Sequence, residues 1–422
     1  MPDVVLAIDA GTTSVRALLV DPGGRILGRA REGYALDYPA PGWVEQNPEP
    51  LWAATRGVVE SALREARLKP SDLCAVGIAA QRTCCVVWER ATGKALSPLV
   101  NWQDLRGAQR ALELQRQGHP VFPQSAACKL EMILGDIDDG RERMARGELA
   151  WGNVDSFLAS RLSGGAAHIT DPSHACATGY YDFVGGGWHA PLLELQGLDP
   201  VFFPQIVDSN GLLGTTARSV FGAEVTLGAI IGDQQSAAIA QGCRKAGEGK
   251  TTYGTSASFD MYTGPEIIGV QGTYPLVLIR QNGETSYCVE GMVFTAGAVF
   301  DWLAHGLGAL ENPAQSDTLA ASVKDTHGVY MLPALQGLGA PYMDPQQSAL
   351  IGGLTRGATK AHVARAAMEG IAFRVREMLD RIYEDSGLPR PSSLAADGGA
   401  SANDLFMQIQ ADALGQPVER MA

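Results

Sequence analysis

The first thirty-odd residues carry the pattern of an antiparallel meander. Residues 4–8 form an apolar run, and residues 14–20 alternate between apolar and polar positions as a half-buried strand does. Small polar residues separate these two segments, and residues 21–24 (Asp-Pro-Gly-Gly) have the composition of a tight turn. A third strand is expected over residues 25–32. The pattern therefore predicts three short antiparallel strands at the start of the chain.

Helical periodicity follows the meander. A helix is predicted over residues 48–66, with Asn47 as its N-cap and Pro48 in its first turn. Strands are expected over residues 73–79 and 84–88. A long amphipathic helix begins after Thr359 and ends before Gly387, and a short strand over residues 393–396 precedes another helix. This mixture of strands and long helices predicts an α/β fold.

The opening pattern partly returns in the middle of the chain. An apolar strand over residues 229–231 leads into Gly-Asp-Gln-Gln and a helix of small residues to Gly242. Residues 254–256 (Gly-Thr-Ser) then enter a strand over residues 259–263, as Gly-Thr-Thr-Ser at residues 11–14 enters the second strand of the meander. We interpret this as a duplicated domain. The two halves are expected to cover residues 1–245 and 246–422.

Composition and charge exclude several classes of protein. The 33 basic and 46 acidic residues give a formal net charge of −13, which argues against a nucleic-acid or anionic-membrane binder. The chain contains no run of about 18 apolar residues, the length that a membrane span requires. Its N-terminus lacks the basic segment of a signal peptide. Seven cysteines without a Cys-x-x-Cys pair favour buried free thiols in a reducing, cytoplasmic compartment.

One glycine-rich segment resembles a phosphate-binding P-loop only superficially. Residues 247–251 read Gly-Glu-Gly-Lys-Thr, but the position where the first glycine of the motif belongs is Arg244. A P-loop also follows a strand and opens a helix, whereas this segment follows a helix and precedes a strand. We therefore reject a P-loop here.

The turn after the first strand has the chemistry of a phosphate site. Successive backbone N–H groups at a glycine turn can bind an anion, and the hydroxyls of Thr12, Thr13 and Ser14 add donors. Arg16 can direct a cation at the same anion, and Asp9 at the strand end can hold Mg²⁺. An ordinary β-turn is the alternative interpretation. The similar turn at Gly254-Thr255 and a further glycine turn at residues 398–399 favour the phosphate site.

Three further positions are candidates for the chemistry itself. Asp233 lies at a strand-to-helix junction, where a carboxylate can accept a hydroxyl proton during phosphoryl transfer; a helix N-cap is the alternative. Arg82 follows the strand over residues 73–79 and can aim its guanidinium into a cleft. Trp102 can stack on the apolar face of a ligand or belong to the core.

The ordered set of motifs resembles the FGGY carbohydrate kinases, and among them most of all the glycerol kinases, across essentially the whole chain. The segments that carry the resemblance are residues 9–16, 41–45, 81–82, 102, 232–235, 253–255, 296–298, 337–342, 353–357 and 397–399. The resemblance implies two actin/Hsp70-like (ribonuclease H-like) domains, with mixed sheets flanked by helices and an ATP cleft between them. It also implies ATP-dependent phosphorylation of a small polyol or sugar, with Mg²⁺, by a cytoplasmic homodimer or homotetramer.

The resemblance further implies roles for individual residues. Asp233 corresponds to the catalytic base, and Asp9 with Asp233 to the acidic residues near Mg²⁺. The positions that correspond to nucleotide contacts are Thr12, Thr13, Ser14, Arg16, Gly254, Thr255, Gly297, Gly399 and Asn403. Those that correspond to substrate contacts are Arg82, Thr83, Trp102, Gln124, Asp233 and Gln234.

The chain departs from the glycerol kinases at three of the positions that form their substrate pocket. Thr83 stands where they have a glutamate that grips the substrate, Gln124 where they have a tyrosine, and Ser258 where they have a phenylalanine. A roomier and differently polar pocket suggests another polyol or sugar, with glycerol as the alternative. Family members also continue beyond the residue that corresponds to 422, so we expect a shortened chain.

Two alternatives to a polyol kinase stay open. One is a pentulose or hexulose kinase such as xylulokinase. The other is a non-catalytic sugar or nucleotide sensor on the same fold, because a fold alone does not fix a function.

Overall fold

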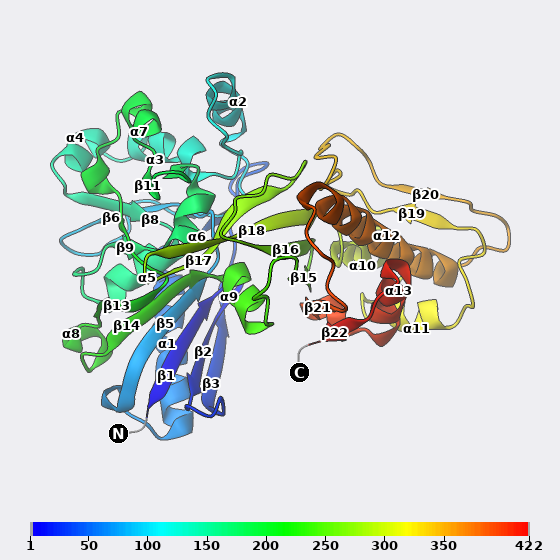
Figure 1. The fold of residues 1–422 in the computed structure, drawn as a ribbon, viewed down its shortest axis with the longest axis horizontal. Coiled ribbons are helices and arrows are strands. Elements are labelled where there is room, and N and C mark those ends of the chain that lie inside the picture. The colour runs from blue at the N-terminus through cyan, green and yellow to red at the C-terminus, as the bar shows by residue number, and fades with distance from the viewer. Residues whose placement is uncertain (1–2, 421–422) are drawn as a thin grey trace. The chain divides into compact units, whose positions relative to one another are not determined.

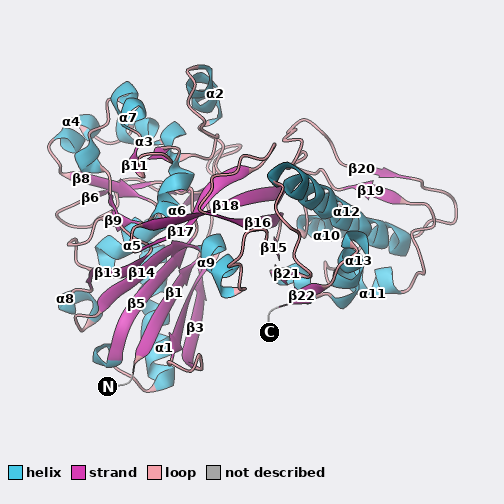
Figure 2. Ribbon diagram, viewed as in Figure 1, coloured by secondary structure: helices cyan, strands magenta, loops and turns pink. Residues whose placement is uncertain are grey.

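The computed structural model describes residues 3–420 (Figure 1). The chain divides into two compact units. The first contains Met1–Ser236 and Val277–Thr285, and the second contains Ala237–Leu276 and Ser286–Ala422. Each unit is built around a six-stranded mixed sheet with helices packed against it, which is the predicted α/β architecture (Figure 2).

The sheet of the first unit has the strand order β13-β14-β5-β1-β2-β3. Its strands are β1 (Val4–Ala10), β2 (Ser14–Val20), β3 (Ile26–Gly33), β5 (Leu73–Ala80), β13 (Asn210–Thr215) and β14 (Thr226–Gly232). The pairs β1–β2 and β2–β3 are antiparallel, so the predicted meander is confirmed. β5 joins β1 in parallel and β14 joins β5 in parallel. The carboxyl ends of β1, β5 and β14 therefore lie along one edge of the sheet.

Helix α1 (Pro48–Ala66) has the predicted bounds. The Asn47 side chain accepts a hydrogen bond from the backbone N–H of Glu49 at 3.0 Å, which satisfies one of the free donors of the first turn. At the other end Arg67 adopts a left-handed conformation with φ 55°. The buried face of α1, which includes Leu51 and Val58, belongs to the same core cluster as the apolar side chains of β1 and β2.

Smaller elements complete the first unit. They are β4 (Glu45–Gln46), β6 (Val86–Glu89), β7 (Leu99–Val100), β8 (Leu149–Gly152), β9 (Ile169–Thr170), β10 (Tyr181–Asp182), β11 (Gly187–Trp188), β12 (Gln205–Ile206), α2 (Ala108–Arg116), α3 (Leu130–Gly135), α4 (Gly140–Ala145), α5 (Val154–Leu162), α6 (Pro172–Ala175), α7 (Ala190–Gln196) and α8 (Arg218–Phe221). β6 begins two residues later than the predicted strand over residues 84–88. Cys85 already exchanges backbone hydrogen bonds with Val100 at 2.8 and 3.0 Å as an isolated bridge. Two residues earlier, Thr83 is left-handed, with φ 61°.

The sheet of the second unit has the order β17-β18-β16-β15-β21-β22. Its strands are β15 (Gly249–Tyr253), β16 (Ala257–Gly264), β17 (Tyr274–Gln281), β18 (Glu284–Val293), β21 (Leu394–Asp397) and β22 (Val418–Arg420). β15, β16 and β18 are antiparallel neighbours, and β21 and β22 add in parallel beside β15. This repeats the topology of β1, β2, β3, β5 and β14, so the predicted duplication is present in the fold.

Residues 277–285 connect the second sheet to the first unit. β17 and β18 form a hairpin, and its tip, Val277–Thr285, belongs to the first compact unit. At this tip the Arg280 Nε donates to Asp208 Oδ1 at 2.8 Å, and the backbone N–H of Gly283 donates to Asp208 Oδ2 at 3.0 Å. The tip is thus held by a charge-assisted pair of bonds to a single carboxylate.

The helices of the second unit pack on its own core. They are α10 (Ala298–Asp301), α11 (Gln315–Ala321), α12 (Lys360–Ser386) and α13 (Asp404–Leu414), and a short helix α9 (Asp233–Ala240) precedes the unit's first strand. The predicted ends of the long helix are confirmed: Thr359 forms a capping box and Gly387 caps the other end with φ 66°. A two-stranded sheet of β19 (Tyr330–Leu332) and β20 (Leu350–Gly352) completes the unit.

Three expectations drawn from the sequence can be compared with the structure. Residues 249–251 of the rejected P-loop segment lie in β15, which is a strand rather than the opening of a helix. All seven cysteines are free thiols, and six of them are buried. Among the described residues, no helix is both long enough and apolar enough to cross a membrane.

Candidate functional site

The first candidate feature is the hairpin between β1 and β2. Its turn is closed by a hydrogen bond from the Gly11 backbone N–H to the Ser14 carbonyl at 3.1 Å. Asp9 and Arg16 face each other in the register of the two strands, and Arg16 Nη1 lies 3.6 Å from Asp9 Oδ2. The predicted anion ligand Arg16 therefore also partners the predicted metal ligand.

Long-range contacts hold this hairpin in place. The Tyr34 hydroxyl donates to the Gly11 carbonyl, and the Gln46 amide donates to the Thr12 carbonyl at 2.5 Å. The indole N–H of Trp102 donates to the Thr12 hydroxyl at 2.9 Å. Trp102 was predicted to stack on a ligand or to belong to the core. Its observed contact is with the predicted phosphate hairpin, and its side chain also packs against the core of the first unit.

The three hydroxyls of the hairpin differ in their surroundings. Ser14 is buried and its hydroxyl accepts a hydrogen bond from Arg31 Nε at 3.1 Å. Thr12 is half-buried and engaged by Trp102, whereas Thr13 is exposed at the tip. Thr13 is therefore the most accessible hydroxyl donor of the three.

A buried amide network supports the same region and was missed by the sequence analysis. Gln46, Gln81 and Asn101 are almost completely buried, and their side-chain amides bond to one another at 2.9–3.1 Å. The network links the hairpin to the residues that precede Arg82 and Trp102 in the chain. Buried polar networks of this kind fix geometry when every member is satisfied. A lone glutamine or asparagine gives no sequence signal for such a role.

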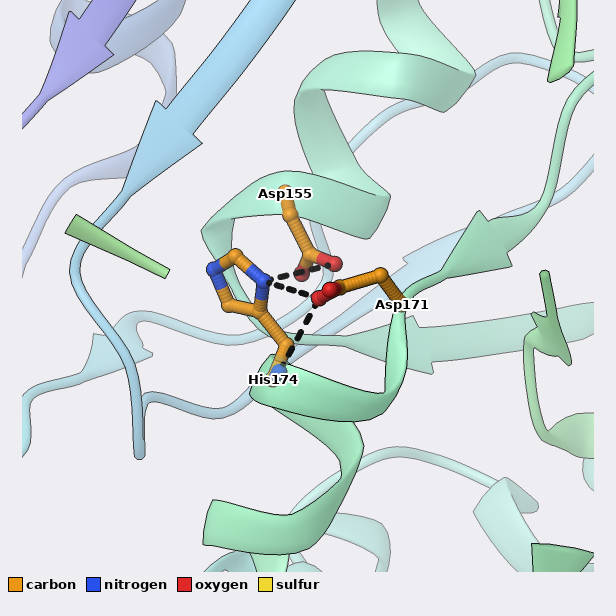
Figure 3. A group of neighbouring side chains, drawn as sticks. All are labelled: Asp155, Asp171 and His174. Atoms are coloured by element: carbon orange, nitrogen blue, oxygen red, sulfur yellow. Dashed lines mark hydrogen bonds and ion pairs between the residues drawn. The ribbon is translucent and has the colours of Figure 1, made fainter. Parts of the chain in front are cut away.

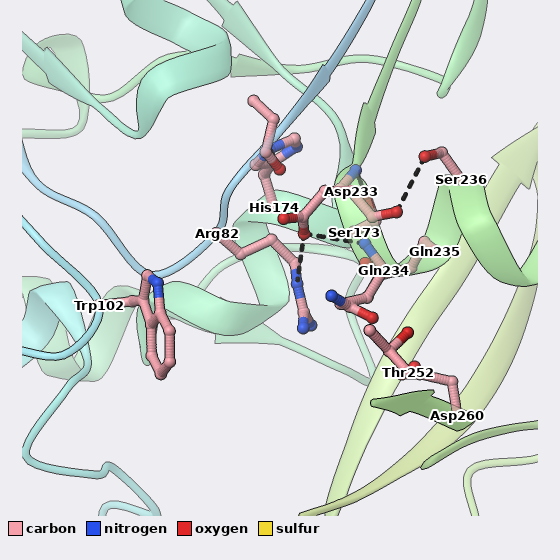
Figure 4. A network of polar contacts seen from close by, with 12 residues as sticks. Arg82, Trp102, Ser173, His174, Asp233, Gln234, Gln235, Ser236, Thr252 and Asp260 are labelled. Carbon is pink, nitrogen blue, oxygen red and sulfur yellow. Dashed lines mark hydrogen bonds and ion pairs between the residues drawn. The ribbon is translucent and has the colours of Figure 1, made fainter. Parts of the chain in front are cut away.

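Asp233 and Arg82 form the second candidate feature (Figure 4). Asp233 follows β14 directly and is the first residue of α9, and its Oδ1 accepts from the backbone N–H of Gln234 at 2.8 Å. Arg82 follows the neighbouring parallel strand β5, and its Nε lies 4.0 Å from the same oxygen. The guanidinium is largely buried and the carboxylate is about 29% exposed, so Asp233 remains open to a ligand.

Asp9 and Asp233 influence each other electrostatically. Burial raises the pKa of Asp9, the charge of Asp233 raises it further, and Arg16 and Arg31 lower it by less. A carboxylate whose ionisation is disfavoured by a second carboxylate forms with it a suitable ligand set for a hard divalent cation, because the cation removes their repulsion. The donor chemistry of Asp9 and Asp233 thus fits Mg²⁺.

Thr83 has a strained backbone. Its φ of 61° is a left-handed conformation that β-branched residues rarely adopt. Strain of this kind persists where the surrounding structure fixes it, and it is often found at functional sites. Thr83 lies directly after Arg82 and is one of the predicted substrate contacts.

Replacement of Thr83 by asparagine should relieve this strain. Asparagine tolerates the left-handed region, so we expect Thr83→Asn to raise the free energy of unfolding by about 1 kcal/mol. Thr83→Val keeps the β-branch and should not. Urea denaturation of both variants beside the parent provides the measurement. Equal stability of the asparagine variant and the parent would contradict strain at this position.

The remaining substrate-binding predictions lie in different settings. Gln124 is half-buried in the turn before the short helix of residues 126–128. Gln234 lies in the first turn of α9, beside Asp233. Ser258 is buried within β16. Their contacts with a substrate stay a prediction.

The predicted nucleotide contacts Gly254, Thr255 and Gly297 of the second unit lie in two loops that contact each other. The backbone N–H of Gly297 donates to the Gly254 carbonyl at 2.9 Å, and that of Ala298 donates to the Thr255 carbonyl at 3.2 Å. A Cβ added at Gly297 would lie 2.5 Å from the Gly254 carbonyl oxygen. Only glycine therefore allows this close approach of two loops.

The second glycine turn lies next to the first. Gly398 has φ 88°, and a Cβ there would lie 2.4 Å from the Tyr253 carbonyl oxygen. Gly399 is exposed and has open space where a Cβ would point. Asn403 is the N-cap of α13: its side-chain oxygen accepts from the Phe406 N–H at 2.9 Å, and its amide donates to Asp317. Its observed role is thus structural, and a nucleotide contact stays a prediction.

Comparison with known proteins agrees with this arrangement. The N-terminal domain of the FGGY family of carbohydrate kinases matches residues 4–240, and the C-terminal domain of that family matches residues 249–422. A glycerol kinase from Aromatoleum aromaticum is 42% identical over 427 residues, which cover 99% of this chain and 86% of that protein.

Solved structures show the same fold. The structure of Plasmodium falciparum glycerol kinase with ADP superposes with a TM-score of 0.90 at 25% identity, covering 99% of this chain and 86% of that one. Xylulose kinase from Lactobacillus acidophilus has a TM-score of 0.84 over 99% of this chain and 86% of that one, and at 20% identity this likeness concerns the fold alone. The two matched domains, which together span nearly the whole chain, place it in the FGGY family of carbohydrate kinases.

Proposed function

We propose that this chain transfers the γ-phosphoryl group of ATP to a hydroxyl of a small polyol or sugar, with Asp233 as the general base. The observation that carries the proposal is the Asp233 carboxylate at the start of α9, partly exposed and beside the Arg82 guanidinium. Membership of the FGGY family and the similarity to glycerol kinases support the reaction class.

The proposed reaction uses these groups in a simple order. The acceptor hydroxyl binds near Arg82 and Gln234, with Trp102 close to the same end of the sheet. Its oxygen attacks the γ-phosphorus while Asp233 takes its proton, and the bond to the leaving β-phosphate oxygen breaks. Backbone N–H groups of the hairpin at residues 11–14 bind phosphate oxygens, with the Thr13 hydroxyl as a further donor.

Nucleotide contacts are assigned to the second unit in the same proposal. Gly254, Gly297 and Gly399 would let the backbone approach the nucleotide without side chains in the way, with Thr255 beside them. Mg²⁺ would be held by Asp9 and Asp233, directly or through water, and when bound it neutralises charge on the phosphates.

Removal of the Asp9 charge should raise the stability of the metal-free protein and reduce the stabilisation that Mg²⁺ provides. Because the fold disfavours ionised Asp9, we expect Asp9→Asn to raise the Tm of the metal-free protein at neutral pH. The parent should gain stability on addition of Mg²⁺, whereas the variant should gain little. Thermal unfolding with EDTA and with excess Mg²⁺ measures both. An equal Mg²⁺ response in parent and variant would remove Asp9 from the metal site.

We infer the class of acceptor from the predicted pocket positions at which this chain and the glycerol kinases have different residues. Threonine in place of glutamate at residue 83 removes a carboxylate, which is worth about 1.5–3 kcal/mol as a charge-assisted bond to a hydroxyl. We therefore propose that an acceptor other than glycerol is preferred. A homodimer or homotetramer and a cytoplasmic location belong to the same proposal.

The test is ADP release with Mg-ATP over a panel of acceptors: glycerol, erythritol, xylitol, ribitol, dihydroxyacetone, xylulose and ribulose. One acceptor with clear turnover, and a phosphorylated product identified by mass, would support the proposal and name the substrate. Turnover only with xylulose or ribulose would favour a pentulose kinase. A folded chain that binds ATP but is silent with every acceptor would overturn the proposal in favour of a sensor.

A further inference from the structure

A fully buried cluster of Asp155, Asp171 and His174 lies in the first unit (Figure 3). The His174 Nδ1 lies 3.0 Å from Asp171 Oδ1 and 3.4 Å from Asp155 Oδ2. On the other side of the ring, Nε2 lies 3.2 Å from the Ala80 carbonyl oxygen. The proposed mechanism uses none of these three side chains.

The partners of the ring fix its protonation state. A carbonyl oxygen can only accept, so Nε2 carries a proton, and Nδ1 faces carboxylate oxygens and carries one as well. Burial by itself lowers the pKa of His174, but Asp155 and Asp171 outweigh it, with a smaller contribution from Asp233, so that the pKa is raised. The raised pKa favours the protonated form of His174, whereas burial also raises the pKa of its partner Asp155.

Hydroxyl groups also donate to both carboxylates of the cluster. The Thr170 hydroxyl donates at 2.7 Å to Asp155 Oδ2, the oxygen that also faces His174, and the Ser209 hydroxyl donates to Asp171 Oδ2 at 2.6 Å. The Ser156 hydroxyl donates to Asp155 Oδ1 at 3.4 Å. Complete satisfaction by hydrogen bonds is the signature of a rigid polar network.

Two residues of this network, Ser173 and His174, form hydrogen bonds to the ends of β5 and β14. Ser173 donates its hydroxyl proton to Asp171 Oδ1 at 2.7 Å, and its oxygen accepts from the Gly232 backbone N–H at 2.8 Å. His174 donates to the carbonyl of Ala80. Ala80 and Gly232 are the last residues of β5 and β14, and they are partners in the parallel register of those strands.

These two strand ends deliver the proposed reacting groups. Asp233 directly follows Gly232, and Arg82 follows Ala80 by two residues. Figure 4 shows Ser173 and His174 in the same polar network as Arg82 and Asp233. A shift of either strand end would move one of the two side chains relative to the other.

We propose that Ser173 and His174 are positioning residues: they clamp the ends of β5 and β14 and so hold Arg82 and Asp233 in the geometry that phosphoryl transfer needs. The expected effect on kcat rests on the proposed kinase activity. The clamp, which consists of the hydrogen bonds to the two strand ends, does not depend on that activity. A displacement of about 1 Å at reacting groups can cost roughly a hundredfold in rate.

Ser173→Ala removes the acceptor of the Gly232 N–H. We expect kcat to fall tenfold or more while KM for ATP changes by less than about twofold, because the change acts on the reacting geometry. Thr170→Val is the matched control: it removes a hydroxyl from the same buried network, but that hydroxyl donates to Asp155 rather than to β5 or β14. Thr170→Val should lower the Tm by about as much as Ser173→Ala does, and it should leave kcat within about twofold of the parent.

A second pair of variants distinguishes the role of the His174 Nε2 from that of its Nδ1. The amide of glutamine can take the place of Nε2, so His174→Gln keeps the donor to Ala80, whereas His174→Asn keeps only the donor to Asp171. We expect the glutamine variant to retain at least about tenfold more kcat than the asparagine variant.

Hydrogen exchange tests the clamp without any activity. Amides of residues 80–82 and 231–233 should exchange faster in Ser173→Ala than in the parent, and at the parental rate in Thr170→Val. This readout supports the clamp even if the acceptor panel is silent, in which case the proposed function fails alone. Unchanged exchange at both strand ends in Ser173→Ala, or equal losses of kcat in Ser173→Ala and Thr170→Val, would overturn the inference.

Discussion

Asp233→Asn is expected to lower kcat by about 10²–10⁴-fold, the range over which a general base contributes. Asparagine is also a good residue for a helix start, and it has nearly the same size as aspartate. The variant therefore preserves any structural role at the beginning of α9 and removes the basic carboxylate that accepts the proton. Steady-state ADP release with the best acceptor measures the effect, and circular dichroism with the Tm checks the fold.

The control for this variant is another aspartate at a helix start. Asp199 accepts from the backbone N–H of Val201 at 2.9 Å at an exposed 3₁₀ turn, far from any candidate residue in sequence. Asp199→Asn should leave kcat unchanged. If Asp233→Asn turned over ATP as fast as Asp199→Asn, Asp233 would be only a helix cap and the base would have to be sought elsewhere.

Two glycines of the second unit should respond to alanine in different ways. Gly297→Ala places a Cβ 2.5 Å from the Gly254 carbonyl oxygen, so the two loops must separate. We expect a clear fall in Tm and a loss of ADP binding. Gly399→Ala meets nothing within 4 Å, so its Tm should match that of the parent. If nucleotide approaches the backbone there, the Kd for ADP should rise roughly tenfold, equivalent to about 1.4 kcal/mol.

Isothermal titration with ADP and thermal unfolding distinguish these outcomes. Gly269→Ala is the matched control, because Gly269 is also free of close neighbours but carries no predicted nucleotide contact. It should change neither the Tm nor the Kd. Unaltered ADP affinity in Gly399→Ala would remove this turn from the nucleotide site, whereas an unaltered Tm in Gly297→Ala would show that the loops adapt to a side chain.

The elements that could be predicted from the sequence are those with local signals. α1 begins and ends as predicted because Asn47 and Pro48 define its start, and α12 because Thr359 and Gly387 cap it. The meander follows from alternation and turn residues. The left-handed Thr83 could not be predicted, because no local signal favours that conformation for a β-branched residue.

The candidate site divides in the same way. Asp9, Arg82 and Asp233 lie within two residues of strand ends, where ordered motifs identify them. The residues that hold them, such as Gln46, Tyr34 and His174, act through partners more than 20 residues away in the chain. Only the tertiary structure brings such pairs together, so a single sequence contains no pattern that indicates their roles.

The hairpin tip at residues 277–285 has a consequence for synthesis of the chain. The polypeptide passes between the two compact units at three points, after Ser236, Leu276 and Thr285. The first unit is therefore incomplete on the ribosome until residue 285 has emerged, by which stage the opening strands of the second unit have also been made. A fragment ending near residue 245 would lack Arg280 and leave Asp208 without its guanidinium partner. Synthesis of the first unit is thus completed only after part of the second unit has been made.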